Sequence, residues 1–251
     1  MRAFERGLNV LRPVVLRREH TKNSDGSVLI ELGETKVLCN VNIQNGVPRW
    51  MKNKGVGWLT AEYGMIPGST NTRVDRESVR GKQMGRTVEI QRFIGRALRS
   101  AINFKSIPDK TILVDCDVLQ ADGGTRTAAI TGSMVALIDA LNKLQRKGII
   151  IKDPLISWVA AVSVGLLENN VLLDLDYTED SRAETDLNIV MNKEKNLIEI
   201  QGAAESGSFT RSQLNKMIDL AEFGIAQLVY AQEKALLFDT NYKSLFGENI
   251  T

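Results

Sequence analysis

The stretch Thr111-Ile-Leu-Val-Asp-Cys-Asp-Val-Leu-Gln-Ala-Asp-Gly-Gly-Thr-Arg-Thr127 contains the transition on which the fold depends. Its first ten residues are rich in β-branched and aliphatic side chains, which predicts a strand over 111–120. A glycine pair follows, and from about Thr127 apolar residues recur at helical spacing. These apolar residues are Ile130, Met134, Leu137, Leu141 and Leu144. The sequence therefore predicts a strand, a tight glycine turn and a core-facing helix in succession.

The junction between this strand and this helix has the features of an anion-binding site. Gly123 and Gly124 allow the backbone to approach a ligand closely, and the first N–H groups of a helix have no partner within it. The helix dipole favours negative charge at the same place. Arg126 in the loop and Arg86 ahead of the preceding helix could supply bidentate charge to one anion. The Gly-Lys-Ser/Thr ending of a P-loop is missing, and such a turn also occurs as a plain structural connection.

The first half of the chain reads as strands followed by helices. Alternating β-branched residues predict a hairpin over 27–32 and 35–43. Residues 44–83 are glycine-rich and aperiodic, which predicts long loops. Helical spacing of apolar residues begins again at about Thr87 and ends before Pro108.

The second half repeats this order. Two hairpins are predicted, the first over 156–168 and 171–177 and the second over 183–191 and 197–202. A long helix follows, and its start has a capping-box pattern, Thr210-Arg-Ser-Gln213. We therefore expect an α+β fold of two layered, strand-then-helix halves, with an N-terminal half over 1–150, a C-terminal half over 151–240 and a flexible tail over 241–251.

An acidic stretch in the second half is the other candidate for chemistry. In the strand from Ala183, polar residues at even positions such as Asp186 share one face, and Asp180 in the preceding loop can fold back beside it. Two converging carboxylates suit Mg²⁺ or Mn²⁺, which bind oxygen ligands. The alternative is a solvated polar strand face. Four further carboxylates compete but lie within predicted strands, namely Asp115, Asp117, Asp174 and Asp176.

The composition excludes several other chemistries. The chain has 251 residues, a formal net charge of +2 and 43% hydrophobic residues, which is typical of a globular protein. His20 is the single histidine, so a two-histidine zinc site is excluded. Cys39 and Cys116 lie in apolar, strand-like runs, as expected for buried free thiols. The longest apolar run is far shorter than a membrane span, and the N-terminus lacks the pattern of a secretory signal, so we expect a cytoplasmic protein without membrane contact.

The positive charge is concentrated in one segment. Between positions 73 and 99, eight basic residues stand against three acidic ones. The basic residues are Arg73, Arg76, Arg80, Lys82, Arg86, Arg92, Arg96 and Arg99. Such a strip could bind a polyanion such as RNA, and the predominance of arginine favours phosphate recognition. A solvated helix face or a subunit contact is the alternative.

Four sequence blocks resemble bacterial ribonuclease PH. They are Gly57-Trp-Leu-Thr-Ala-Glu-Tyr-Gly-Met, Gly85-Arg-Thr-Val-Glu-Ile-Gln-Arg, Leu119-Gln-Ala-Asp-Gly-Gly-Thr-Arg-Thr-Ala and Glu179-Asp-Ser-Arg-Ala-Glu-Thr-Asp. The blocks occur in that family's order, and the resemblance extends from residue 1 to about 238. It implies a ribonuclease PH-like fold and a phosphate-dependent 3′-to-5′ exoribonuclease that trims tRNA precursors and other RNA 3′ ends and releases nucleoside diphosphates reversibly. It also implies a homohexamer, a trimer of dimers, related to the exosome core.

The resemblance assigns roles residue by residue. Arg86, Gly124, Thr125 and Arg126 match phosphate-binding positions, with inorganic phosphate as co-substrate, and Asp180 and Asp186 match the catalytic, metal-associated positions for Mg²⁺ or Mn²⁺. Four arginines match RNA-binding positions, Arg73 and Arg76 in a tRNA-binding loop and Arg92 and Arg96 near the RNA 3′ end. The chain departs from the family at Gly68, where many relatives have an arginine, at Met84 and at Glu5. The alternative functions are a ring subunit that binds RNA without cleaving it and a metal-dependent hydrolytic nuclease.

Overall fold

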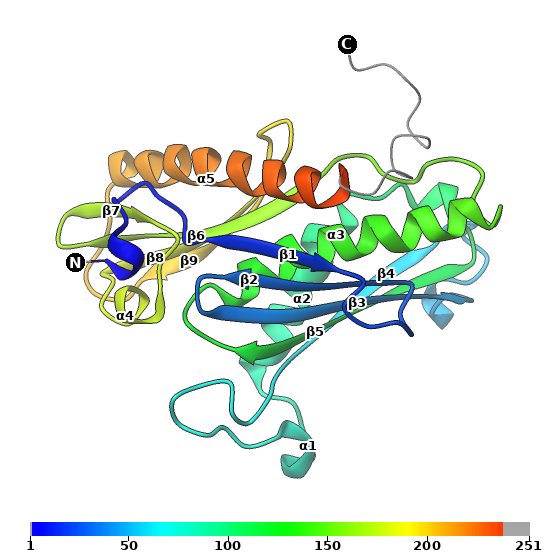
Figure 1. Ribbon diagram of the computed structural model, residues 1–251, viewed down its shortest axis with the longest axis horizontal. Coiled ribbons are helices and arrows are strands. Elements are labelled where there is room, and N and C mark those ends of the chain that lie inside the picture. The colour runs from blue at the N-terminus through cyan, green and yellow to red at the C-terminus, as the bar shows by residue number, and fades with distance from the viewer. Residues whose placement is uncertain (1, 238–251) are drawn as a thin grey trace.

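The computed structural model describes residues 2–237, which form two sheets with three long helices. Figure 1 shows their arrangement. The first sheet has five strands in the order β1-β2-β3-β5-β4. Their bounds are β1 Val14–Arg18, β2 Gly26–Leu32, β3 Thr35–Asn45, β4 Trp58–Met65 and β5 Lys110–Gln120. All neighbours are antiparallel except β4 and β5, which run parallel. Three short 3-10 helices also occur in this half, Ala3–Glu5, Arg49–Met51 and Phe104–Ser106.

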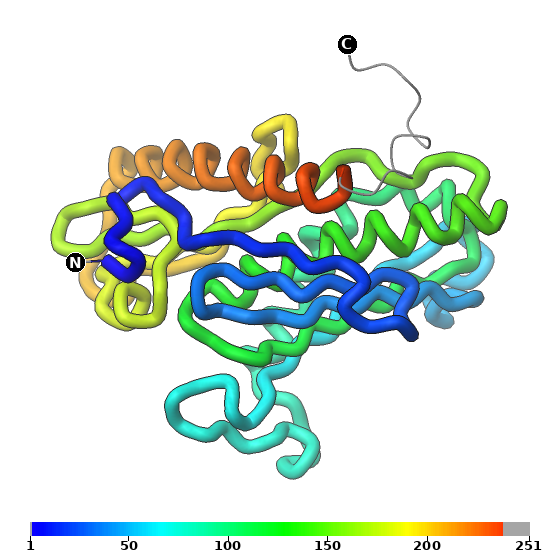
Figure 2. The backbone as a smooth tube through the Cα atoms, in the orientation of Figure 1, coloured from blue at the N-terminus to red at the C-terminus, as the bar shows by residue number. Residues whose placement is uncertain are grey.

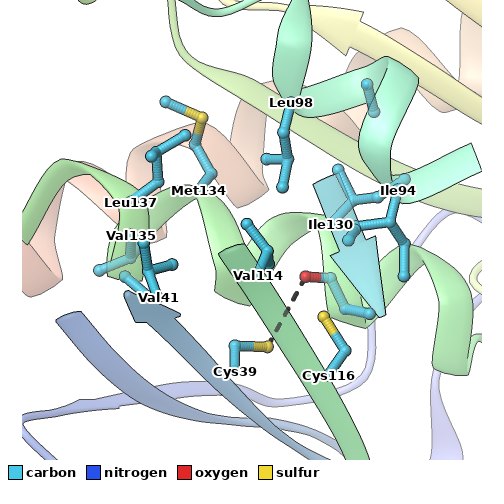
Figure 3. Close-up of a cluster of buried hydrophobic side chains, with 14 of the residues drawn as sticks. Cys39, Val41, Ile94, Leu98, Val114, Cys116, Ile130, Met134, Val135 and Leu137 are labelled. Atoms are coloured by element: carbon cyan, nitrogen blue, oxygen red, sulfur yellow. Dashed lines mark hydrogen bonds between the residues drawn. The ribbon is translucent and has the colours of Figure 1, made fainter. Parts of the chain in front are cut away.

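Two helices, α2 (Gly85–Arg99) and α3 (Thr125–Arg146), cover one face of this sheet. The strands alternate buried and more exposed residues, as a sheet with one packed face requires. Figure 3 shows Cys39 and Val41 of β3 and Val114 and Cys116 of β5 facing the apolar side chains of the helices. Both cysteines are free and buried, which confirms their predicted burial.

The second sheet has the order β7-β6-β8-β9 and is covered by the long helix α5 (Arg211–Leu237). Its strands are β6 Val159–Leu167, β7 Asn170–Leu173, β8 Thr185–Asn192 and β9 Leu197–Ala204. Successive residues of β6 face opposite sides, so Val162 packs in the core beneath α5 while Ala161 joins the core around α3. The helix α3 thus contacts both sheets. The capping box at the start of α5 is present, since Thr210 and Gln213 exchange backbone-to-side-chain hydrogen bonds.

The predicted loop over 44–83 is wrong for its middle part, where β4 forms. Leu59, Ala61 and Tyr63 of this strand are buried on one face, whereas Glu62 is exposed. The flanking glycines hide this alternation in the sequence, and the strand gains its partner only from β5, about fifty residues further along the chain. The short first strand, β1, is absent from the sequence prediction as well.

The predicted strand over 171–177 is too long. β7 ends at Leu173, the backbone turns at Asp174 with a positive φ of 56°, and a one-turn helix α4 (Tyr177–Asp180) follows. Asp174 and Asp176 therefore leave the strand, and Asp180 ends a helical turn instead of lying in an irregular loop. The reason is local, because Asp176 and Glu179 form a capping box that favours the turn.

A segment from Ile66 to Met84 projects from the first sheet and carries the one-turn helix α1 (Glu77–Arg80) at its tip (Figures 1 and 2). Most of its side chains beyond Thr70 are exposed. The predicted tail over 241–251 lies outside the described residues. Within residues 2–237, no helix is both long and apolar enough to cross a membrane.

Candidate functional site

The glycine turn between β5 and α3 has the backbone geometry of an anion cradle. Gly123 and Gly124 both adopt left-handed conformations, with φ of 75° and 65°, and Gly124 is the N-cap of α3. Such conformations are costly for other residues. The amides that follow, beginning with Thr125, start a 22-residue helix and have no acceptor within it. This end of α3 therefore presents N–H donors and a positive dipole to an anion.

The loop is held in this shape by buried polar groups. Thr35, which is fully buried, donates its hydroxyl to the Gly123 carbonyl at 2.7 Å and accepts from the Asp122 N–H at 2.9 Å. The Tyr63 hydroxyl lies 2.8 Å from Oγ1 of Thr125. Burial raises the pKa of the Tyr63 phenol, so this residue stays neutral and hydrogen-bonding at physiological pH.

A cavity of about 440 Å³ opens in front of this loop and contains both predicted clusters. Its lining includes Arg86, Gly124, Thr125, Arg126, Asp180 and Asp186, with Ser163, Asn188 and Glu205 among the other residues. The first sheet, α2 and α3 supply the glycine turn and the arginines, whereas the second sheet and α4 supply the carboxylates. The structure thus brings together all six residues that the sequence assigned to phosphate and to catalysis.

Arg126 is oriented by two neighbours on different elements. Its Nη1 donates to Gln201 of β9 at 2.8 Å and to Glu89 of α2 at 3.3 Å, and its side chain is 13% exposed. Gln201 in turn donates to Glu89. This arrangement fixes one edge of the guanidinium and keeps its positive charge at the cavity wall.

The pKa values of Asp180 and Asp186 are both raised. Burial raises the pKa of Asp180, and the negative charge of Asp186 raises it further, while Arg86 and Arg126 act in the opposite direction. Burial likewise raises the pKa of Asp186, assisted by the charge of Glu205. The cavity therefore places two carboxylates, whose charged forms are disfavoured by burial and by neighbouring negative charge, within electrostatic reach of Arg86 and Arg126.

Asp180 and Asp186 form a small donor set for a divalent cation. Within the described residues there is no group of three or more His, Cys, Asp or Glu side chains arranged to hold a metal ion. Mg²⁺ is commonly bound by one or two carboxylates, with waters and substrate phosphates completing its shell. Asp180 and Asp186, which repel one another, match such a partial donor set.

The four arginines predicted to bind RNA lie outside this cavity. Arg73 and Arg76 are on the projecting segment, and Arg73 pairs with Asp75 at 3.1 Å. Arg76 instead lines an adjoining cavity of about 230 Å³ that also contains Arg86 and Tyr63. Arg92 and Arg96 are exposed on α2, and Arg96 is paired with Glu199 of β9.

Sequence reasoning missed the residues that support the site. Tyr63 lies in strand β4, which the sequence pattern does not indicate, and the same pattern places Gln201 in a strand without a further role. The one sequence signal for Tyr63 was the block at 57–65, which resembles the family but suggests no role for the tyrosine. Contacts such as Tyr63 to Thr125 join residues 62 positions apart, and local patterns contain no information about them.

The fold and the cavity define an α+β protein of two sheet-and-helix units with an anion-binding turn facing a carboxylate pair. Residues 10–141 match domain 1 of the 3′ exoribonuclease family, the RNase PH family, and residues 157–223 match its domain 2. The chain therefore belongs to the RNase PH 3′ exoribonuclease family, and its predicted α+β, ribonuclease PH-like fold is confirmed.

Solved structures share this fold at low sequence identity. Rice (Oryza sativa) Rrp46 is 20% identical with a TM-score of 0.75, over 96% of this chain and 100% of that one. An Archaeoglobus fulgidus exosome with RNA bound to the active site is also 20% identical with a TM-score of 0.75, over 90% of each chain. An archaeal exosome core is 20% identical with a TM-score of 0.70, over 92% of this chain and 89% of that one.

Proposed function

We propose that this protein is a phosphate-dependent 3′-to-5′ exoribonuclease that trims the 3′ ends of tRNA precursors and releases nucleoside diphosphates. The observation that carries the proposal is the shared cavity in which the glycine turn and its arginines face Asp180 and Asp186. An RNA 3′ end and inorganic phosphate both present phosphate oxygens, and this cavity offers amides and guanidinium groups as donors. Family membership supports the same reaction class.

In the proposed reaction, the Thr125 and Arg126 amides and the side chains of Arg86 and Arg126 hold inorganic phosphate in line with the last phosphodiester. An oxygen of hydrogen phosphate forms a bond to that phosphorus while the bond to the ribose 3′ oxygen breaks, and the departing oxygen takes the proton that the hydrogen phosphate gives up. The products are a nucleoside 5′-diphosphate and an RNA one residue shorter. Because one phosphorus–oxygen linkage replaces another, the reaction is reversible when diphosphate is abundant.

The acidic side of the cavity would hold Mg²⁺ or Mn²⁺ through Asp180 and Asp186. When bound, such a cation supplies positive charge that stabilises the developing negative charge on the phosphoryl and leaving oxygens. The protein's own contribution is to place these two carboxylates opposite Arg86 and Arg126 before substrate arrives.

The four exposed arginines would contact RNA outside the cavity. Arg73 and Arg76 on the projecting segment would contact tRNA away from its end, and Arg92 and Arg96 the nucleotides near the 3′ end. Exchange of the Arg96–Glu199 pair for a phosphate contact would accompany RNA binding. We further propose a cytoplasmic homohexamer that also processes other RNA 3′ ends, including those of ribosomal RNA.

The likeness to exosome structures favours one alternative, a ring subunit that binds RNA without cleaving it. A test of both functions uses purified protein, Mg²⁺ and tRNA with a 3′ extension, with and without inorganic phosphate. The proposal expects nucleoside diphosphates only when phosphate is present. RNA binding with no mononucleotide release would instead support the ring subunit, and release of monophosphates without phosphate would indicate hydrolysis.

A further inference from the structure

Arg12, just ahead of β1, bridges the two halves of the cavity although it lies outside its lining. Its side chain is 0% exposed. On one side, its Nη1 donates to the Asp122 carbonyl and its Nη2 to the Gly123 carbonyl, both in the glycine turn. On the other side, its Nε and Nη2 donate to the Asp174 carboxylate at 3.0 and 2.7 Å. The backbone N–H of Arg12 also donates to Asp174 at 2.8 Å.

The two segments joined by Arg12 also touch one another directly. A Cβ added to Gly123 would lie 2.6 Å from the Leu175 carbonyl oxygen and 2.8 Å from the Tyr177 nitrogen, so only glycine allows this approach. The Tyr177 N–H donates to the Asp122 carboxylate at 3.4 Å. Tyr177 begins α4, the single turn that ends at Asp180. The glycine turn therefore lies against the turn that carries Asp180, but this contact consists of packing and one long hydrogen bond, whereas Arg12 joins the two segments through several hydrogen bonds.

The acidic segment, residues 174–180, is also held by two other arginines on its far side. Arg6 donates to the Asp174 carbonyl at 2.7 Å and to Glu179 at 3.1 Å, and Arg2 pairs with Glu179 at 2.6 Å. Figure 2 shows the N-terminal segment lying beside the α4 region, which is far from it in sequence. Of the two segments that Arg12 joins, Arg2 and Arg6 thus hold only the acidic one, whereas Arg12 holds the glycine turn as well.

Arg12 stays positively charged although it is buried. Burial acts to lower the pKa of its guanidinium, but the charge and hydrogen bonds of Asp174, with smaller contributions from Asp122 and Asp176, outweigh burial and leave the pKa raised. The planar guanidinium presents several donors in fixed directions, so it can serve carbonyls and a carboxylate at once. A lysine ammonium keeps the charge but lacks that fork.

We propose that Arg12 is a positioning residue that couples occupation of the phosphate cradle to the position of the acidic turn carrying Asp180. The inference rests on the proposed function for the identity of the anion. Inorganic phosphate that draws the glycine turn toward itself pulls on the Asp122 and Gly123 carbonyls. Arg12 transmits that constraint to Asp174 and so to residues 174–180. The nucleophile's site and the carboxylate pair are then aligned by one buried side chain.

Hydrogen exchange on the full chain tests this coupling without depending on turnover. In the wild type, inorganic phosphate should slow amide exchange both in residues 123–127 and in residues 174–180. In Arg12→Lys, phosphate should slow exchange in 123–127 only. The control is Arg18→Lys, which alters a partly buried arginine elsewhere, paired with Asp139 at 2.6 Å on the body of α3. This control should retain protection in both segments.

Steady-state kinetics give the second readout. Because small misplacements of reacting groups are costly, Arg12→Lys should lower kcat by about 10- to 100-fold with a smaller change in the KM for RNA. If Arg12→Lys does not fold, the double variant Arg12→Met with Asp174→Asn removes both charges together, and it should likewise confine phosphate protection to 123–127. Asparagine also tolerates the left-handed backbone at position 174.

The outcomes separate the two proposals. Phosphate protection of 174–180 that persists in Arg12→Lys, or in the double variant, overturns the coupling. The coupling is also overturned if phosphate slows exchange in neither segment of the wild type. A wild type that shows coupled protection but releases no diphosphate from RNA leaves Arg12 in its positioning role and refutes the proposed reaction instead.

Discussion

At the scale of single residues, the phosphate cradle depends on charges that can be removed one at a time. Arg126→Ala and Arg86→Ala should each raise the KM for inorganic phosphate, because loss of a charged hydrogen bond costs about 1.5–3 kcal/mol, or roughly 10- to 100-fold. Arg17→Ala, which removes an exposed arginine paired with Glu31 on β2, is the control and should leave this KM unchanged. Unaltered phosphate dependence in both cavity variants would contradict the assignment of the cradle.

Asp180 offers a second test at this scale. Asp180→Asn keeps the size of the side chain but removes one of the two charges expected to bind a cation. RNA binding should persist, because the arginines on α2 and the projecting segment are untouched, whereas turnover should be lost. Mn²⁺ binding measured by calorimetry should weaken in parallel. Turnover near the wild-type rate would place the metal on other ligands.

At the scale of elements, the projecting segment contains its own counter-ion. Asp75 is paired with Arg73 at 3.1 Å and with Arg80 at 3.2 Å, and hydrogen bonding to these arginines, Arg80 first, lowers its pKa. The carboxylate therefore competes with RNA phosphates for these guanidinium groups.

Asp75→Asn should consequently strengthen binding of tRNA, whereas Arg73→Ala and Arg76→Ala should weaken it. For each contact to an RNA phosphate that a variant gains or loses, the slope of log K against log salt concentration should change by about one. A short oligonucleotide that reaches only the cavity serves as the control ligand and should respond much less. Equal effects on tRNA and on the oligonucleotide would remove the segment from tRNA recognition.

Close packing of α3 gives a prediction about stability at the same scale. A Cβ at Gly132 would lie 2.7 Å from Cγ2 of Ile30 and 3.0 Å from Sγ of Cys39, so Gly132→Ala should push the helix away from the sheet. Overpacking of this kind costs about 1–3 kcal/mol of unfolding free energy, measurable by urea denaturation. Gly68→Ala is the matched control, since nothing lies within 4 Å of an added Cβ there. A loss of stability as large for Gly68→Ala would show that the packing argument fails.

At the scale of the whole molecule, the sequence predicts those parts whose information is local. The helix α3 and the strands β3 and β5 follow from periodicity, and the capping box of α5 is readable from four residues. β4 escaped prediction because its strand character depends on pairing with β5 and on cover from α2. A short apolar alternation framed by glycines does not reveal such partners.

The candidate site likewise has parts that local sequence motifs indicate and parts that they do not. The glycine turn and the carboxylates could be proposed from short motifs, and the structure places them in one cavity. Their supports could not, because Arg12 and Asp174 are 162 positions apart and meet only after both sheets have formed. A buried arginine in the sequence is indistinguishable from an exposed one, so the residue that joins the two halves of the cavity has no local signature.

The proposed ring is the property of the whole molecule that is most directly measurable. Large apolar side chains remain exposed in the segment between α3 and β6, where Ile149 is 50%, Ile151 94% and Ile156 63% exposed. Contiguous exposed apolar patches are typical of surfaces covered in an assembly, and these three isoleucines lie within a stretch of eight residues. We expect the wild type to sediment at about six times the 27.8 kDa of one chain.

The double variant Ile149→Asp with Ile151→Asp should sediment as smaller species, because a buried carboxylate at an interface carries a large desolvation cost. Val79→Asp, at another exposed apolar position (81%) on the projecting segment, is the control and should retain the full mass. A wild type that remains a single chain at every concentration would contradict the ring. A double variant with undiminished mass would exclude this segment from the interface, and the contact would then lie elsewhere on the chain.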